Sequence, residues 1–199
     1  HDFGKEPTTS LVNKRWRSHS HDEMGSVQTG IFLERLTREL PLIRKVQQLV
    51  LDHLRPHQLY NDRDRVRSPA IRRLALRVPI KDLVRLAHAD YLGIIEVNDR
   101  QYQFPAGEWL LEEASKLSVH ERPPQPFLKG RHLLELGMKQ GPSMGSLLEK
   151  AFDAQINGQI RSLKEALDWA KTMLPQESLA GKNHSEETQN ENQLIPHES

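Results

Sequence analysis

The sequence contains no cysteine, which excludes disulfides and thiolate metal ligands and favours a reducing compartment such as the cytoplasm. No apolar run approaches the roughly 18 residues that a membrane-spanning helix needs, and no signal peptide is recognisable. We therefore expect a cytoplasmic protein with no membrane partner. Hydrophobic residues make up 36% of the 199 residues and charged residues 28%, so the chain can form one or two modest cores and leaves some of its length in solvent.

Charge is unevenly distributed along the chain, although the formal net charge is only +1. Residues 53–85 hold nine Lys and Arg against three acids, whereas residues 175–199 hold five glutamates and one lysine. A basic segment of this kind can contact the phosphates of a nucleic acid, or it can be a solvated helix face. Charge alone favours the solvated face.

The spacing of apolar residues is helical rather than alternating, so we predict an all-α fold. Helices are expected over 22–40 and 42–54, from Pro69, from Pro79 to about Leu92, and over 105–117, whereas 55–68 is expected to be a polar loop. Residues 94–104 are ambiguous. After these, short helices are expected at 133–136, from Gly141-Pro142 to Asn157-Gly158, and from a capping box at Ser162 and Glu165.

Three prolines within residues 120–129 mark the best internal boundary. The resulting division is a helical domain over 1–119, a Pro-rich linker over 120–129, a small helical tail domain over 130–174 and a disordered acidic tail over 175–199.

Two polar residues continue apolar helical stripes. His53 follows Leu42, Val46 and Leu49 at helical spacing, and Asp90 follows Leu76, Ile80, Leu83 and Ala87. If these stripes face the core, an imidazole and a carboxylate point inward, where a carboxylate needs a partner or a metal. Both residues also lie near expected helix ends, where they could simply reach water.

Several segments, in order, resemble the HD domain and RNA-binding tail of bacterial CCA-adding tRNA nucleotidyltransferases and the related poly(A) polymerases. His1 to Lys5 (HDFGK) with Thr8-Thr9 resembles the HD motif of metal-dependent phosphohydrolases. The runs WRSHSHDEMG (16–25), VLDHLRPHQLY (50–60) and RLAHADYLG (85–93) resemble the histidine and aspartate motifs that follow it. Residues 130–166 resemble the RNA-binding segment, so the resemblance covers roughly residues 1–172.

The resemblance implies a site and an activity. It assigns a divalent metal (Ni, Mn, Fe, Co, Zn or Mg) to His1, Asp2, His21, His53 and Asp90, with His21 preferred to His19 as a ligand. Lys5 would help hold a substrate phosphate in catalysis. Such a site activates water for attack on a phosphoester, so we expect hydrolysis of nucleotide or 2′,3′-cyclic phosphate substrates. The tail would bind tRNA.

Candidate RNA contacts are basic residues of the middle segment and of the tail: Arg63, Arg65, Arg67, Arg72, Arg73, Lys129, Arg131, Lys139 and Lys150. The helix start at Gly141-Pro142 offers backbone N–H groups where a phosphate could dock, although it is also an ordinary helix start.

Two departures from the family pattern leave the chain's own activity open. HD proteins usually have a further ligand histidine before the HD pair, and a nucleotidyltransferase head has no counterpart here. The chain begins at His1 without an initiator methionine, so we expect a fragment, a processed product or an incomplete gene model, with the head as its partner. The alternatives are a metal-dependent phosphohydrolase, a non-catalytic tRNA-binding module with a degenerate HD site, or a truncated product with no activity of its own.

Overall fold

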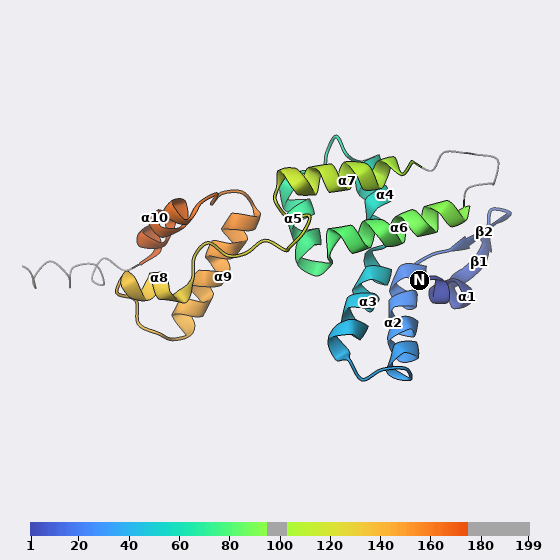
Figure 1. The fold of residues 1–199 in the computed structure, drawn as a ribbon, viewed down its shortest axis with the longest axis horizontal. Helices are drawn as coiled ribbons and strands as arrows, with labels where there is room; N and C mark the ends of the chain where they lie inside the picture. Colours follow the sequence, from blue (N-terminus) through green and yellow to red (C-terminus); the bar gives the residue numbers. More distant parts are fainter. Residues whose placement is uncertain (95–102, 175–199) are drawn as a thin grey trace, which may run out of the picture. The chain divides into compact units, whose positions relative to one another are not determined.

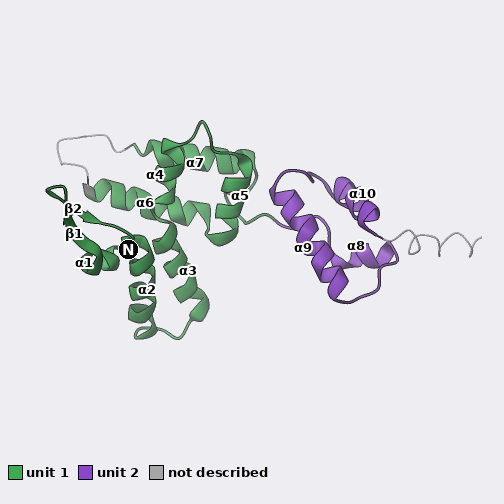
Figure 2. Ribbon diagram, turned by 180° about the vertical axis from the view of Figure 1, so that it is seen from behind, with its two compact units in different colours: residues 1–124 green, residues 125–199 purple. Residues whose placement is uncertain are grey.

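The computed structural model describes residues 1–94 and 103–174, and contacts within the chain divide it into two compact units, residues 1–124 and 125–199 (Figure 2). Both units are helical, which confirms the predicted all-α class (Figure 1). The acidic tail over 175–199 and most of the ambiguous segment over 94–104 lie outside the described residues. Among the described helices, none is long and apolar enough to cross a membrane.

Unit 1 begins with the 3-10 turn η1 (Asp2–Gly4), the short helix α1 (Lys5–Thr8) and an antiparallel hairpin of β1 (Thr9–Val12) and β2 (Arg15–Ser18). Its longer helices are α2 (His21–Glu34), α3 (Leu40–Asp52), α4 (Arg55–Asn61), α5 (Ser68–Arg77), α6 (Ile80–Ile94) and α7 (Pro105–Lys116). Unit 2 contains α8 (Gly130–Glu135), α9 (Pro142–Ile156) and α10 (Leu163–Met173).

Prolines start many of these helices. Pro41, Pro56, Pro69, Pro105 and Pro142 each occupy one of the first two positions of a helix. Proline suits this place because its φ is already helical and the N–H that it lacks would have no partner within the helix. The prolines of the sequence therefore set where α3, α4, α5, α7 and α9 begin.

Three expectations about local structure are wrong. The helix predicted over 22–40 ends at Glu34, and Pro41 begins the next helix instead of breaking the first. Residues 55–61 of the predicted polar loop form α4, whose Pro56 is buried. A hairpin also lies within residues 9–18, where no strand was expected. Its strands are four residues long and mostly exposed, so no alternation of apolar and polar residues marks them.

The main core of unit 1 lies between α5, α6 and α7. Ile71, Leu83 and Leu110 are among its buried side chains, and Phe104 and Val119 close its ends. The pair α2 and α3 lies beside this core (Figure 1). Gly30 of α2 leaves room for the Gln47 side chain of α3, since a Cβ there would lie 2.2 Å from its Nε2. That amide nitrogen donates to the Ser26 carbonyl, which ties α3 to α2.

Unit 2 has a small core of its own around Leu133, Leu147 and Ala166. Buried Gln155 holds residues 125–127, which precede α8, on this core. Its amide nitrogen donates to the Gln125 carbonyl at 2.8 Å, and its amide oxygen accepts from the Phe127 N–H at 2.9 Å. Within the Pro-rich segment 120–129, Glu121 instead pairs with Lys81 of unit 1. Each end of the segment is therefore attached to its own unit. The expected capping box is found in part: the Ser162 hydroxyl accepts from the Glu165 N–H, as expected.

Asp52, at the end of α3, is a buried carboxylate, with 2% of its surface exposed. The Arg77 guanidinium donates to both carboxylate oxygens of Asp52, at 2.7 and 3.3 Å. The Gln48 amide donates to one of these oxygens at 2.7 Å. A buried carboxylate held this way connects the ends of α3 and α5. It also fixes the backbone of its neighbour, His53.

Replacing Arg77 with alanine should lower the free energy of unfolding by about 3 kcal/mol, because it strips a buried charge of its main partner. Urea denaturation monitored by circular dichroism measures this. Lys116→Ala, which removes an exposed lysine paired with Glu112 and Glu113, is the matched control and should leave the free energy of unfolding almost unchanged. Equal effects of the two variants would contradict the structural role assigned to Arg77.

Candidate metal centre

The first residues of the chain lie against the start of α2 at unusually short range. A Cβ on Gly4 would stand 2.0 Å from the His21 carbonyl oxygen and 2.5 Å from the Gly25 nitrogen. A Cβ on Gly25 would stand 3.0 Å from the His1 carbonyl oxygen. At Gly4 only glycine leaves this space, and at Gly25 a side chain would make the contact tight, so these two residues allow the His1–Gly4 segment to lie beside His21.

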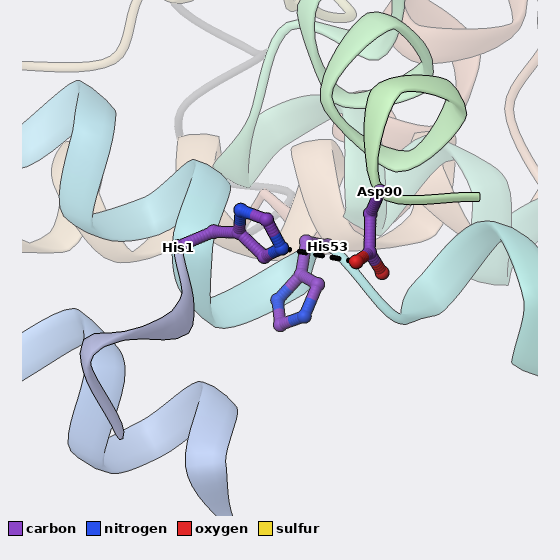
Figure 3. Close-up of side chains that lie close together, drawn as sticks. All are labelled: His1, His53 and Asp90. Carbon is purple, nitrogen blue, oxygen red and sulfur yellow. Dashed lines mark hydrogen bonds and ion pairs between the residues drawn. The ribbon is translucent and has the colours of Figure 1, made fainter. Parts of the chain in front are cut away.

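The His1 imidazole lies between two carboxylates. Its Nε2 is 3.0 Å from Oδ1 of Asp90 on α6 and 3.2 Å from Oδ1 of the adjacent Asp2 (Figure 3). The ligand atoms of His1, His53 and Asp90 all lie within 4.8 Å of one another. Three segments far apart in sequence thus bring nitrogen and oxygen donors to one point.

His21 joins this group through His53. Their Nε2 atoms are 3.3 Å apart, and their rings meet edge to face. Each ring's Nδ1 is hydrogen bonded to a backbone carbonyl, Ser18 for His21 and Val50 for His53. Since a carbonyl oxygen only accepts, both Nδ1 atoms donate, so in the neutral form of each ring Nε2 carries a lone pair, and these two nitrogens face each other.

Two facing lone pairs need a proton or a cation between them. A second proton on His53 is disfavoured, because burial of this side chain lowers its pKa below the usual value. Two imidazole nitrogens bound to one ion at about 2.0–2.1 Å would be roughly 3–3.4 Å apart, which matches the observed spacing. Hydrogen bonds from Nδ1 to carbonyl oxygens are also the usual support of metal-bound histidines. The donor set therefore fits a divalent metal.

The charges of the group also fit a cation. Asp2 and Asp90 approach the same His1 nitrogen, and Lys5 is the nearby positive charge, with its Nζ 2.9 Å from Oδ2 of Asp2. Asp2 therefore presents one oxygen to His1 and the other to Lys5. Lys5 is 41% exposed, so its ammonium lies at the rim of the group and not inside it.

The predicted ligands His1, Asp2, His21, His53 and Asp90 are thus brought together, whereas no hydrogen bond, ion pair or ring contact joins His19 to them in the described part of the chain. The apolar stripes used to find His53 and Asp90 are only partly buried. Leu42 and Leu76 are exposed, and Leu76 belongs to α5 and not to the helix of Asp90. His53 is nevertheless 1% exposed, which the helix-end alternative did not expect.

The predicted RNA contacts are divided between the two units. Arg63, Arg65 and Arg67 are exposed in the segment between α4 and α5, where the Arg63 guanidinium lies 4.6 Å from the Tyr60 ring centroid. Arg72 and Arg73 lie on α5 of the same unit. Lys129, Arg131, Lys139 and Lys150 are exposed in unit 2. The basic residues therefore form separate groups within each unit.

Sequence reasoning missed the residues that position the ligands. Gly4, Gly25 and the Asp52–Arg77 pair carry no chemistry of their own, and only the close packing of the first turn, α2, α3 and α5 makes them important. The one available signal was a glycine within a helix, at Gly25, where the residue costs stability unless space demands it.

No protein-family model and no solved structure matches the chain. The chain is 28% identical over 171 residues to the CC-adding tRNA nucleotidyltransferase of Thermus thermophilus. The match takes in 83% of this chain and 36% of that protein, so the chain spans about a third of its relative's length. This distant similarity supports a role related to the tRNA nucleotidyltransferases.

Gly4→Ala should weaken metal binding at least tenfold, the size of effect seen when supporting residues around a metal site are lost. The added methyl group would meet backbone atoms of His21 and Gly25, which have no room to yield, so the first turn must move away from α2. Calorimetric titration with Ni²⁺ measures the affinity. Gly145→Ala, at a helix position with open space, is the control and should leave it unchanged.

In the metal-free protein, His53 should make stability depend on pH. Its folded-state pKa is lowered, so its contribution is complete above the unfolded value of about 6.5 and is lost as the pH falls below that value. The free energy of unfolding, measured with urea in chelator, should therefore drop between pH 7.5 and 5.5, and His53→Gln should flatten this drop. The exposed His19→Gln variant is the control; a His53→Gln profile as steep as the wild-type one would refute the assignment.

Proposed function

We propose that unit 1 is a divalent-metal phosphohydrolase centre of the HD type, within a protein of the tRNA nucleotidyltransferase system that works in 3′-end CCA addition or repair. The observation that carries the proposal is the pair of Nε2 lone pairs of His21 and His53, both oriented by backbone carbonyls and facing each other at 3.3 Å. Two such lone pairs repel each other, and an ion bound between them would account for their position.

His1, His21, His53, Asp2 and Asp90 would hold the metal. Mixed imidazole and carboxylate donors suit Mn, Fe, Co, Ni or Zn better than Ca or Mg alone. When bound, such an ion lowers the pKa of a coordinated water and polarises phosphoryl oxygens.

The chain's own residues supply orientation and charge. Lys5, held by Asp2 at the exposed rim, offers an ammonium to a phosphate oxygen of the substrate and partly offsets its negative charge. The fixed tautomers of His21 and His53 keep both Nε2 atoms aimed at one point before a substrate arrives. Small phosphoesters with an accessible phosphate, such as 2′,3′-cyclic phosphates, suit a centre of this kind.

Unit 2 is proposed to bind tRNA through its exposed cations, which include Lys129, Arg131 and Lys139. The distant CC-adding relative acts on tRNA by its name, and a cation set of this kind would bind phosphates with little sequence preference and strong salt dependence.

The exposed face of α2 is proposed to pack against a nucleotidyltransferase head, in the same chain or another. Phe3, Ile31 and Phe32 line a groove of about 510 Å³ there, and each has more than 40% of its surface exposed. Apolar side chains gathered in this way usually mark an interface.

His53→Ala should remove bound metal and lower the rate of 2′,3′-cyclic AMP hydrolysis by at least 100-fold, since it deletes the ring at the centre of the donor set. Metal content by plasma mass spectrometry and product formation by chromatography measure the two effects. His19→Ala, a neighbouring histidine outside the group, should change neither.

The alternative function is a non-catalytic tRNA-binding module with a degenerate HD site. A wild-type protein that takes up no metal and hydrolyses no cyclic phosphate, yet binds tRNA in a salt-dependent way, would favour this alternative and overturn the enzyme assignment.

A further inference from the structure

The β1–β2 hairpin lies in the chain between two metal-ligand segments, after Asp2 and before His21 (Figure 1). Its strands pair from Thr9 with Ser18 to Val12 with Arg15. The two tip residues, Asn13 and Lys14, have φ values of 50° and 62°, as two-residue hairpin turns of the favoured twist require. The hairpin is therefore a regular, well-formed element, and its exposed side chains have defined positions.

One face of the hairpin carries a large exposed apolar pair. Trp16 is 73% exposed and Leu11, its direct cross-strand partner, is 59% exposed. On the same face, nearer the base, the hydroxyls of Thr9 and Ser18 are hydrogen bonded at 2.7 Å. A tryptophan this exposed contributes little to folding, so its ring is available to a ligand.

The hairpin also carries three exposed cations, one at its tip and two on the face opposite the aromatic one. Lys14 is at the tip, and Arg15 and Arg17 lie on the opposite face of β2 by strand alternation. All three are exposed and form no ion pair with any other residue that the structure describes. By contrast, Lys5, Lys45 and Lys81 of the same unit each have an acidic partner. The ribbon is only two strands wide, so long arginine side chains can reach a ligand that crosses it.

The base of the hairpin adjoins the metal centre directly. The carbonyl oxygen of Ser18, the last residue of β2, accepts the hydrogen bond from Nδ1 of His21 at 2.9 Å. A molecule bound along the hairpin would therefore run toward the group of His1, His53 and Asp90.

We propose that the β1–β2 hairpin binds an unpaired RNA strand, with a base stacked on Trp16 and phosphates on Lys14, Arg15 and Arg17, and leads it to the metal centre. Aromatic rings for bases combined with cations for the backbone are the usual means of holding single strands. A duplex hides the faces of its bases and offers nothing for Trp16 to stack on. The inference rests on the proposed function only for the reaction at the strand's phosphoester; binding by the hairpin is independent of it.

The test is the affinity of the full chain for a fluorescein-labelled 12-nucleotide oligoadenylate, measured by fluorescence anisotropy at several salt concentrations. Trp16→Ala should weaken binding about 10-fold, from the loss of one stacked base, while Trp16→Phe should retain most of the affinity. Leu36→Ala, which removes another strongly exposed apolar side chain of unit 1, is the matched control and should have no effect.

The double variant Arg15→Ala/Arg17→Ala should reduce the slope of log affinity against log salt by about 1.4, from two lost phosphate contacts at about 0.7 each. Arg85→Ala, an 80% exposed arginine on α6, should not change the slope. An unlabelled duplex RNA of equal length should compete poorly against the single strand.

His53→Ala separates this proposal from the function proposed above: it should abolish metal-dependent hydrolysis and leave oligonucleotide binding intact. Unchanged binding by Trp16→Ala, or duplex RNA competing as well as single strands, would overturn the hairpin proposal while leaving the metal centre untouched. A change of oligomeric state in Trp16→Ala, seen by sedimentation and without loss of RNA affinity, would instead assign this face to a second copy of the chain.

Discussion

The candidate centre depends on one close backbone contact, in which the Gly4 segment lies against the start of α2 at Gly25. Without a Cβ at either position, the first turn approaches near enough for His1 to come beside His53 and Asp90, and for Asp2 to share the His1 nitrogen. Any larger residue at Gly4 would collide with main-chain atoms, which do not rotate away as a side chain does. The ligand geometry is therefore set by backbone packing before any metal or substrate takes part.

The Asp52–Arg77 ion pair is a second interaction that positions the residues of the candidate centre. Asp52 precedes His53, and its carboxylate is held by Arg77 from α5 and Gln48 from within α3. A buried ion pair is a weak source of net stability, because desolvation offsets much of the attraction. Here the ion pair fixes the end of α3 relative to α5. The His53 ring, whose Nδ1 donates to the Val50 carbonyl, is thereby held in one orientation.

Much of the fold followed from the sequence. The prolines that open α5, α7 and α9 marked helix starts correctly, and the apolar spacing was helical in both units. The structure departs from the sequence reading where short elements depend on packing. Helix α4 has seven residues, too few to be stable alone, and lies on α7. The hairpin strands bury almost none of their side chains, so no alternation of apolar and polar residues marks them in the sequence.

The sequence named the residues of the candidate centre, but not the packing that brings them together. His53 and Asp90 were found because polar residues continued apolar stripes, even though Leu42 and Leu76 of those stripes prove to be exposed. Leu83 and Ala87, the last two stripe positions before Asp90, are buried, and a helix carries that direction one turn further. The stripe of His53 has no buried member, and the buried residue next to this histidine in α3 is Val50, which lies outside the stripe. The spacing of apolar residues along one helix does not say how closely two separate segments approach each other in space. The approach of His1 to Asp90 is set by packing between parts of the chain that are 89 residues apart.

The contact between the Gly4 segment and the start of α2 also gives the hairpin its place in the chain. A chain that must place Asp2 and His21 at one point has to return on itself within a few residues, and the β1–β2 turn is the shortest regular way to do so. Such a connection needs no tryptophan at its surface and no run of unpaired cations. Closure of the loop therefore does not explain Trp16, Lys14, Arg15 and Arg17, and the His21 ring held by the Ser18 carbonyl joins them to the candidate centre. A connection required by the ligand geometry thus also provides a surface on which an RNA strand could reach that geometry.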